Sequence, residues 1–124
     1  MLGDAKVEVT IPVVDLDRAK KFYGETLGLK PMGVDIPESE LYEAGSGTLV
    51  YIYLRGATKA DHTVASFEVP DVEETVKELK EKGVVFEEYD NEQVKTVDGV
   101  ATLGDSKVAW FKDTEGNILA VGQK

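Results

Sequence analysis

The sequence predicts an α+β protein built from two tandem βαβββ modules. A stretch of alternating apolar residues that runs into an amphipathic helix occurs twice, at residues 7–29 and 63–84. Asp71 in the second copy corresponds to Asp15 in the first, an offset of 56 residues. After each helix come further short apolar segments separated by turn residues. A repeat of this length that occurs twice indicates a duplicated supersecondary unit.

The first copy opens with a strand and continues into a helix. Residues 7–13 alternate between apolar and more polar side chains, which is typical of a half-buried strand. Asp15 stands where a helix N-cap is expected, with a carboxylate able to accept hydrogen bonds from unpaired amides. Gly28 is placed to end the helix. The apolar residues between them recur at helical spacing: Leu16, Ala19, Phe22, Tyr23 and Leu27.

The remainder of the first module is predicted as short strands. Residues 30–37 contain two prolines, which favours an edge strand, and residues 40–44 form the next strand. After a glycine-rich turn, residues 48–54 place two tyrosines on the face opposite the aliphatic residues. The small, polar residues 56–61 are predicted to link a first module, 6–55, to a second, 62–123.

The second module repeats this order. A strand over residues 63–69 leads into a helix that begins at Asp71 and ends at Gly83. We expect further strands at residues 84–88, 107–111 and 118–121, the last two joined by a tight turn. Residues 89–99 are polar and are expected to form a loop or weak hairpin, with a lid as one possible role.

The alternation of side chains predicts two different faces on each sheet. The helices should cover the outer face, and because twisted sheets curve, the opposite faces should form a cup in a mixed sheet. Small-molecule pockets combine apolar walls with a few polar groups, as this predicted lining does. The residues assigned to the cup are Glu8, Thr10, Tyr51, Tyr53, Val64, Ser66, Val108, Trp110 and Ala120.

Composition and charge exclude several classes of function. The chain has 14 basic and 24 acidic residues and a net charge of −10, which disfavours binding to nucleic acid or to an anionic membrane surface. It has no cysteine, so disulfides and thiolate chemistry are excluded. No apolar run is long enough to span a bilayer, and no signal peptide precedes Val7, so we expect a cytoplasmic protein.

Two segments resemble the signature stretches of the vicinal oxygen chelate superfamily. These are residues 13–29, with Asp-Leu-Asp-Arg-Ala-Lys-Lys-Phe-Tyr at their centre, and residues 111–119, Phe-Lys-Asp-Thr-Glu-Gly-Asn-Ile-Leu. The superfamily includes glyoxalase I, bleomycin-resistance proteins, fosfomycin-resistance enzymes and extradiol dioxygenases. The resemblance implies paired βαβββ modules that form a cup, often in a homodimer.

The resemblance also implies where a metal would bind. In the enzymatic members a divalent metal is held in the cup by one side chain from each of four strands, and these positions fall on Glu8, Tyr51, Val64 and Ala120. Valine and alanine have no donor atom, whereas protein-held catalytic metals generally need about three protein ligands. We therefore expect no metal and no other cofactor.

The resulting expectation is a metal-free binding protein of the bleomycin-resistance type, with an aromatic or cationic ligand in the cup. Glu8 could bind a cationic group or act as a general base, or it could be a structural glutamate. His62 is expected to face solvent at the start of its strand, unless a register shift brings it toward the cup.

Two alternatives are also compatible with the sequence. One is a metal-dependent lyase, isomerase or dioxygenase in which Glu8 and His62 are the catalytic candidates. The other is an inert interaction module whose cup is filled by its own aromatic side chains. The sequence does not decide the identity of the ligand, nor whether a cup forms within one chain or is shared across a dimer.

Overall fold

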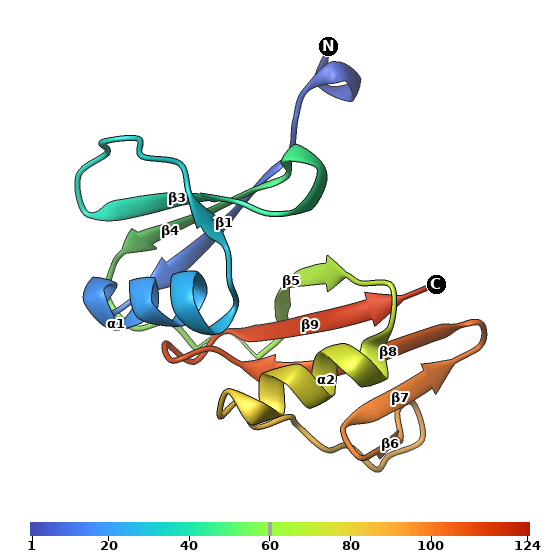
Figure 1. Ribbon diagram of the computed structural model, residues 1–124. Helices are drawn as coiled ribbons and strands as arrows, with labels where there is room; N and C mark the ends of the chain where they lie inside the picture. Colours follow the sequence, from blue (N-terminus) through green and yellow to red (C-terminus); the bar gives the residue numbers. More distant parts are fainter. Residues whose placement is uncertain (60) are drawn as a thin grey trace. The chain divides into compact units, whose positions relative to one another are not determined.

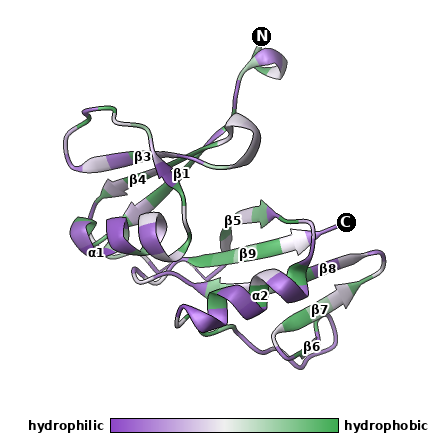
Figure 2. Ribbon diagram, viewed as in Figure 1, coloured by the Kyte–Doolittle hydropathy of each residue, from purple (hydrophilic) through white to green (hydrophobic). Residues whose placement is uncertain are grey.

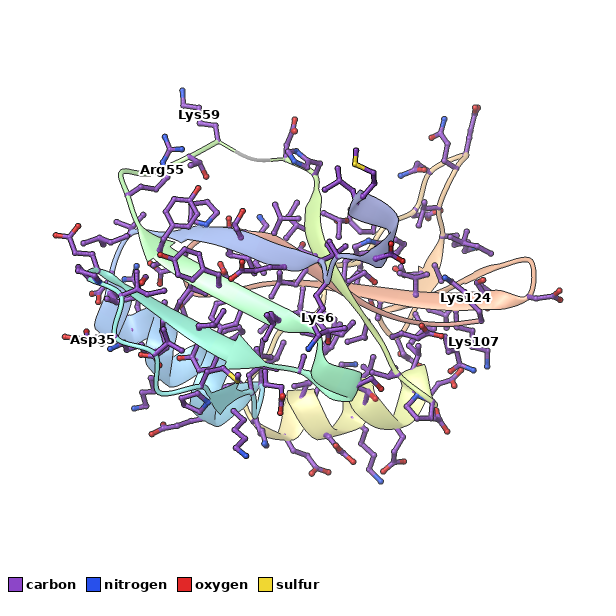
Figure 3. The ribbon with its side chains drawn as sticks, turned by 90° about the horizontal axis from the view of Figure 1, so that it is seen from above. Lys6, Asp35, Arg55, Lys59, Lys107 and Lys124 are labelled. Carbon is purple, nitrogen blue, oxygen red and sulfur yellow. The ribbon has the colours of Figure 1, made fainter. Side chains whose placement is uncertain are left out.

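The computed structural model describes residues 1–59 and 61–124, which form two compact units divided after Lys59 (Figure 1). Each unit contains one sheet and helical segments, which confirms the predicted α+β class. Arg55 and Lys59 extend their side chains away from the ribbon that follows β4 (Figure 3). Ala60, within the predicted linker 56–61, lies outside the described residues.

The first unit contains a four-stranded sheet in the order β1-β4-β3-β2. β1 is parallel to β4, and the other neighbours are antiparallel. The predicted helix begins as an α-helix and continues as a turn of π-helix. The elements are η1 Leu2–Asp4, β1 Glu8–Val13, α1 Leu16–Lys21, η2 Phe22–Thr26, β2 Lys30–Pro31, β3 Ser39–Glu43, η3 Gly45–Gly47 and β4 Leu49–Leu54.

The core of the first unit lies on one face of this sheet. Ile11 pairs with Ile52 across β1 and β4, and both side chains are fully buried. α1 contacts β4, and its N-terminus is capped by Asp15, whose carboxylate accepts a hydrogen bond from the amide of Arg18 at 3.0 Å. The alternation in the sequence therefore correctly separated the buried face from the opposite one.

The second unit contains a five-stranded sheet in the order β5-β9-β8-β7-β6. β5 and β9 are parallel, and the other neighbours are antiparallel. Figure 2 shows β9 as hydrophobic over most of its length, as expected for a central strand. The elements are β5 Thr63–Glu68, α2 Val72–Glu81, β6 Thr96–Val97, β7 Val100–Leu103, β8 Ser106–Lys112 and β9 Ile118–Gln123.

α2 is fixed to the sheet at its N-terminus. Asp71 accepts a hydrogen bond from the amide of Glu74 at 3.1 Å, as predicted for an N-cap. The amide of Val72 donates to the side-chain oxygen of Gln123 in β9 at 2.6 Å. α2 contacts β8 and β9 and buries its apolar residues, including Val76. Among the described residues no helix has the length and hydropathy needed to span a membrane.

The strand predicted at residues 84–88 is wrong. Only Phe86 forms an isolated bridge there, with Phe111, and Val85 is 82% exposed. β7 pairs with β8 from Ser106 to Ala109, which it reaches through a two-residue turn at Gly104 and Asp105, and this leaves only the end of β8 to Phe86. A hairpin with so short a loop needs little ordering of the chain, so β7 is the local partner for β8. The predicted strand at 30–37 is also shorter, since β2 contains only Lys30–Pro31.

The buried Tyr42 in β3 predicts a dependence of stability on pH. Burial raises the pKa of its hydroxyl from 10.0 to about 12, and the nearby charge of Glu40 adds to this effect. Because the pKa of the folded state exceeds that of the unfolded state, the contribution to stability is complete below pH 10 and is lost as pH rises toward 12.

Denaturant unfolding at pH 8 and at pH 11.5 tests this prediction. Between these values the wild type should lose about 2 kcal/mol more unfolding free energy than a Tyr42→Phe variant, which has no hydroxyl to ionise. Comparing the two proteins removes the contribution of the other tyrosines and the lysines. Equal losses in the two proteins would contradict the prediction.

Candidate functional site

The second unit has a pocket of about 260 Å³ at one end of β5, β8 and β9. Strand residues form one part of its wall, the two residues before β5 form another, and the segment that follows α2 forms the rest. The lining residues are Asp61, His62, Thr63, Tyr89, Asn91, Gln93, Val94, Trp110 and Ile118.

Two aromatic rings form the most distinctive part of this wall. The rings of Trp110 and Tyr89 meet edge to face, with centroids 5.5 Å apart and an angle of 85° between the planes. Both side chains are only half-buried. Trp110 and Ser66 both pair with Ala120, so these three predicted site residues lie in one row on the face opposite the buried Phe111. The arrangement leaves aromatic surface available to a ligand.

The segment carrying Tyr89 is held in place by a hydrogen-bond network. The amide of Tyr89 donates to the hydroxyl of Thr96 at 2.8 Å, and that hydroxyl donates to the carboxylate of Glu88 at 2.6 Å. The amide of Gly99 donates to the same carboxylate oxygen at 2.8 Å. The hydrogen bonds from Thr96 and Gly99 lower the pKa of Glu88, so the carboxylate remains charged and the network persists at neutral pH.

The rim of the pocket is formed by a compact turn. Asn91 accepts hydrogen bonds with its side-chain oxygen from the amides of Gln93 and Val94, each at 2.9 Å. Asp90 and Lys95 form an isolated bridge on either side of this turn. The segment predicted as a loop or weak hairpin is therefore turn-like in the structure, and its role as a lid remains a prediction.

A register shift in β5 changes which residues reach the pocket. Thr63 pairs with Ile118, whereas Ala65 pairs with Leu119, so the chain contains one extra residue between these two pairs. Val64 occupies that irregular position, and Thr63 rather than Val64 contributes to the pocket lining. In the sequence, the alternation of side chains in this strand, followed back from Phe67, gives no sign of the extra residue.

His62 and Asp61 add polar groups to the aromatic wall. The Nδ1 atom of His62 lies 3.8 Å from a carboxylate oxygen of Asp61, a pair that is ionic only when the imidazole is protonated. Their side chains are 73% and 101% exposed, so both can rearrange around a bound molecule. The pocket therefore combines aromatic surface with an acceptor carboxylate and an imidazole.

The predicted site residues of the first unit lie on β1 and β4. Thr10 and Tyr51 are direct cross-strand partners, and Tyr53 lies two residues further along β4. The rings of Tyr51 and Tyr53 are stacked, with centroids 6.1 Å apart and planes inclined by 14°. Glu8 is exposed and pairs with Leu49. This face of the sheet offers aromatic rings and one carboxylate.

The positions implied for a metal do not form a suitable donor set. Tyr51 pairs with Thr10 rather than with Glu8, so even the two oxygen-bearing positions are not direct neighbours in the sheet. Val64 and the buried Ala120 have no donor atom. Among the described residues no group of three or more His, Cys, Asp or Glu side chains could hold a metal ion. The residues present therefore do not fit a metal bound at these four positions.

Several residues that line the pocket were not assigned to a site from the sequence. Tyr89, Asn91, Gln93 and Val94 belong to a segment whose polar composition indicated only a loop. Asp61 and Thr63 precede the register shift in β5, or lie beside it. The only usable signal was the aromatic Tyr89 at the start of an otherwise polar segment.

The chain was compared with known families and structures. The family model described as Glyoxalase/Bleomycin resistance protein/Dioxygenase superfamily matches residues 7–121. Comparison with curated proteins gave no match.

Solved structures with the same fold include proteins with different stated roles. A member of this superfamily from Sphaerobacter thermophilus is 22% identical, with a TM-score of 0.75 and complete coverage of both chains. TnmS3, an antibiotic binding protein from Streptomyces sp. CB03234, is 20% identical, with a TM-score of 0.73 and coverage of 99% of this chain and 98% of its own. A lactoylglutathione lyase from Agrobacterium tumefaciens is 19% identical, with a TM-score of 0.71 and coverage of 97% and 93%. The match over residues 7–121 shows that the chain belongs to the glyoxalase/bleomycin resistance protein/dioxygenase superfamily.

Proposed function

We propose that this protein binds a small aromatic or cationic molecule and does so without a metal ion. The observation that carries the proposal is the pair formed by Trp110 and Tyr89 in the wall of the 260 Å³ pocket. Half-buried indole and phenol rings that are already held at a fixed angle provide flat surfaces for stacking or for a cation–π contact. We therefore expect a one- or two-ring group, rather than a large ligand, to enter this pocket.

Charge favours a cationic ligand over an anionic one. The carboxylate of Asp61 lines the same pocket, and the whole chain has a net charge of −10. A strongly negative protein attracts cations at long range and repels anions, an effect that salt weakens. A cation placed over the indole ring would gain from both the ring and the nearby carboxylate.

The donor set supports binding without a metal. Of the four positions that the family resemblance assigns to a metal, Val64 and Ala120 have no donor atom, which leaves fewer than the usual three protein ligands. The superfamily fold is shared by TnmS3, whose description is an antibiotic binding protein, and by a lactoylglutathione lyase. A binding role and an enzymatic role are therefore both compatible with the fold, and the residues of the site favour binding.

A fluorescence titration tests the proposed ligand class directly, because Trp110 is the only tryptophan in the chain. The probes share one ring and differ in charge: benzyltrimethylammonium, benzyl alcohol and benzoate. We expect a saturable change in tryptophan emission with the cation, a weaker one with the neutral probe and none with the anion. An equal response to all three probes would contradict recognition of a cationic aromatic group. Absence of any response would favour the inert module.

A metal analysis separates the binding role from the enzymatic alternative. Protein purified without chelators is expected to contain far less than one equivalent of zinc, iron, manganese or nickel. Adding these ions should leave the melting temperature unchanged, because a tightly bound ligand would raise it. Stoichiometric metal with strong stabilisation would contradict the proposal and favour a lyase, isomerase or dioxygenase.

The proposal extends to a homodimer, as the family resemblance implies, and to a cytoplasmic location, as expected from the lack of an apolar targeting segment. Light scattering coupled to size-exclusion chromatography would report twice the mass of one chain. A monomeric mass at all concentrations would contradict the dimer but would leave the binding role intact.

A further inference from the structure

A second cavity of about 880 Å³ lies in the second unit, on the face of the sheet that carries α2. We call this cavity the α2–β7 groove. It shares no residue with the aromatic pocket. Its lining residues are Glu73, Val76, Lys77, Lys80, Glu81, Lys95, Val97, Asp98, Val100, Thr102 and Lys107.

The groove exists because one helix is too narrow for the sheet beneath it. α2 contacts β8 and β9, while β7 and β6 extend the same sheet beyond β8. A helix with its side chains is about 10 Å wide and neighbouring strands are about 4.8 Å apart, so a single helix covers roughly two strands. The helix-side face of β7 and β6 therefore remains open beside α2 (Figure 1).

Strand pairing places an apolar floor in this open region. Val97 pairs with Val100, which in turn pairs with the buried Ala109 under the helix. Because cross-strand partners share a face, the two valines lie on the side of the sheet that α2 occupies. Val97 is 67% exposed, and the buried Val76 lines the groove from the helix. The groove therefore has an apolar floor, part of which is open to solvent.

Lysines surround the floor. Lys77, Lys80, Lys95 and Lys107 line the groove, four of the 14 basic residues of the chain, against the three acids Glu73, Glu81 and Asp98. The local balance is thus one positive charge, in a chain whose total is −10. The groove is a positively charged region on a negative protein, so its charge complements an anion.

Two of these lysines already have partners. The ammonium group of Lys107 donates to the carboxylate of Glu73 at 2.7 Å, which joins β8 to α2 and raises the pKa of Lys107. Lys80 makes a long hydrogen bond, 3.5 Å, to the backbone carbonyl of Asp98. Within the described part of the chain, Lys77 and Lys95 make no ion pair. They are the ammonium groups best able to receive an added carboxylate.

We propose that the α2–β7 groove binds a monomeric amphipathic carboxylate. Its apolar chain lies over Val76, Val97 and Val100, and its carboxylate lies near Lys77 and Lys95. The volume of the groove suits a ligand of this size, since small-molecule sites commonly measure about 300–1,000 Å³. This ligand is opposite in charge to the one proposed for the aromatic pocket, so the two sites would be independent in their specificity.

The experiment uses three probes with the same ten-carbon chain: decanoate, decanol and decylammonium. Each is titrated into isotope-labelled full-length protein, below the concentration at which micelles form, and the methyl resonances of the three floor valines are followed by NMR. We expect decanoate to bind at least about tenfold more tightly than decylammonium, with decanol between them. We also expect the affinity for decanoate to fall as salt is added.

Paired variants test the contributions of the apolar floor and of the lysines separately. Val97→Glu places a carboxylate on the floor and should weaken decanoate binding more than about tenfold. Val85→Glu, at an even more exposed valine outside the groove, should leave it unchanged. The double variant Lys77→Gln/Lys95→Gln should weaken decanoate binding about five- to tenfold and leave decanol binding unchanged. Lys82→Gln, an exposed lysine of the α2 C-cap that does not line the groove, is its control.

Specific outcomes would overturn the proposal. These are no shift of the floor methyl resonances with decanoate, equal affinity for decanoate and decylammonium, or equal effects of the two glutamate substitutions. Binding only to vesicles of anionic lipid, without a response to monomeric decanoate, would overturn it as well. Because the benzyl probes report on Trp110 and the decyl probes on the valines, failure of one site is distinguishable from failure of the other.

Discussion

Replacing Phe111 by alanine is expected to lower the free energy of unfolding by about 3–5 kcal/mol. Phe111 is fully buried in β8 on the helix-side face, where it pairs with the equally buried Leu119. Its ring also contacts that of Phe86, with centroids 5.3 Å apart, so alanine would remove contacts to β9 and to the segment that follows α2 and leave a cavity. Urea denaturation followed by circular dichroism measures the loss.

The adjacent residue provides the matched control. Trp110 precedes Phe111 on the same strand but points to the opposite face and is only half-buried. Trp110→Leu should therefore cost about 1 kcal/mol or less of unfolding free energy, although it removes the larger side chain. If the two substitutions were equally destabilising, the separation of the sheet into a core face and an open face would be wrong.

This separation of faces is the part of the structure that the sequence reveals most directly. Alternation along residues 7–13 and 48–54 predicted the buried pair of Ile11 and Ile52. Asp15 and Asp71 marked the starts of the two helices. Each carboxylate accepts a hydrogen bond from the amide three residues further along the chain, and this is a local interaction. Such features depend on neighbours in the chain and can be recognised without knowing the tertiary fold.

The sequence did not predict features that depend on which of two segments pairs with the same strand. Residues 84–88 and 100–103 are both apolar enough to pair with β8. The short turn at Gly104 and Asp105 favours the second segment, and the first keeps a single bridge at Phe111. That turn was a signal that could have identified β7. The register shift between Thr63 and Ala65 had no comparable signal, since the alternation on either side of it appears regular.

In the candidate site, too, the sequence predicted the regular strand positions but not the contacts that depend on the folding of a loop. The strand residues Trp110, Ser66 and Ala120 were assigned together by alternation, and the register places them in one row. Tyr89 reaches Trp110 only because Glu88, Thr96 and Gly99 fold its segment back onto the sheet. These hydrogen bonds join residues up to eleven positions apart within a polar stretch, and no periodicity indicates which of them will form.

The largest functional effect is expected from Trp110→Leu. Leucine keeps an apolar side chain on β8 but removes the aromatic face, so binding of benzyltrimethylammonium should weaken by about 30-fold or more, which corresponds to about 2 kcal/mol. Calorimetry is the suitable measurement, because the variant has no tryptophan to report binding.

A graded pair of variants shows whether the indole acts through its aromatic surface. Trp110→Phe retains a ring with a smaller face and should lose only about three- to fivefold in affinity, between the wild type and leucine. Tyr89→Leu should also weaken binding, since it removes the ring that holds Trp110 edge to face. If phenylalanine and leucine at position 110 had the same effect, the ligand would be recognised by shape alone. If neither changed the affinity, the cationic aromatic molecule would bind elsewhere, and the pocket would not be the functional site.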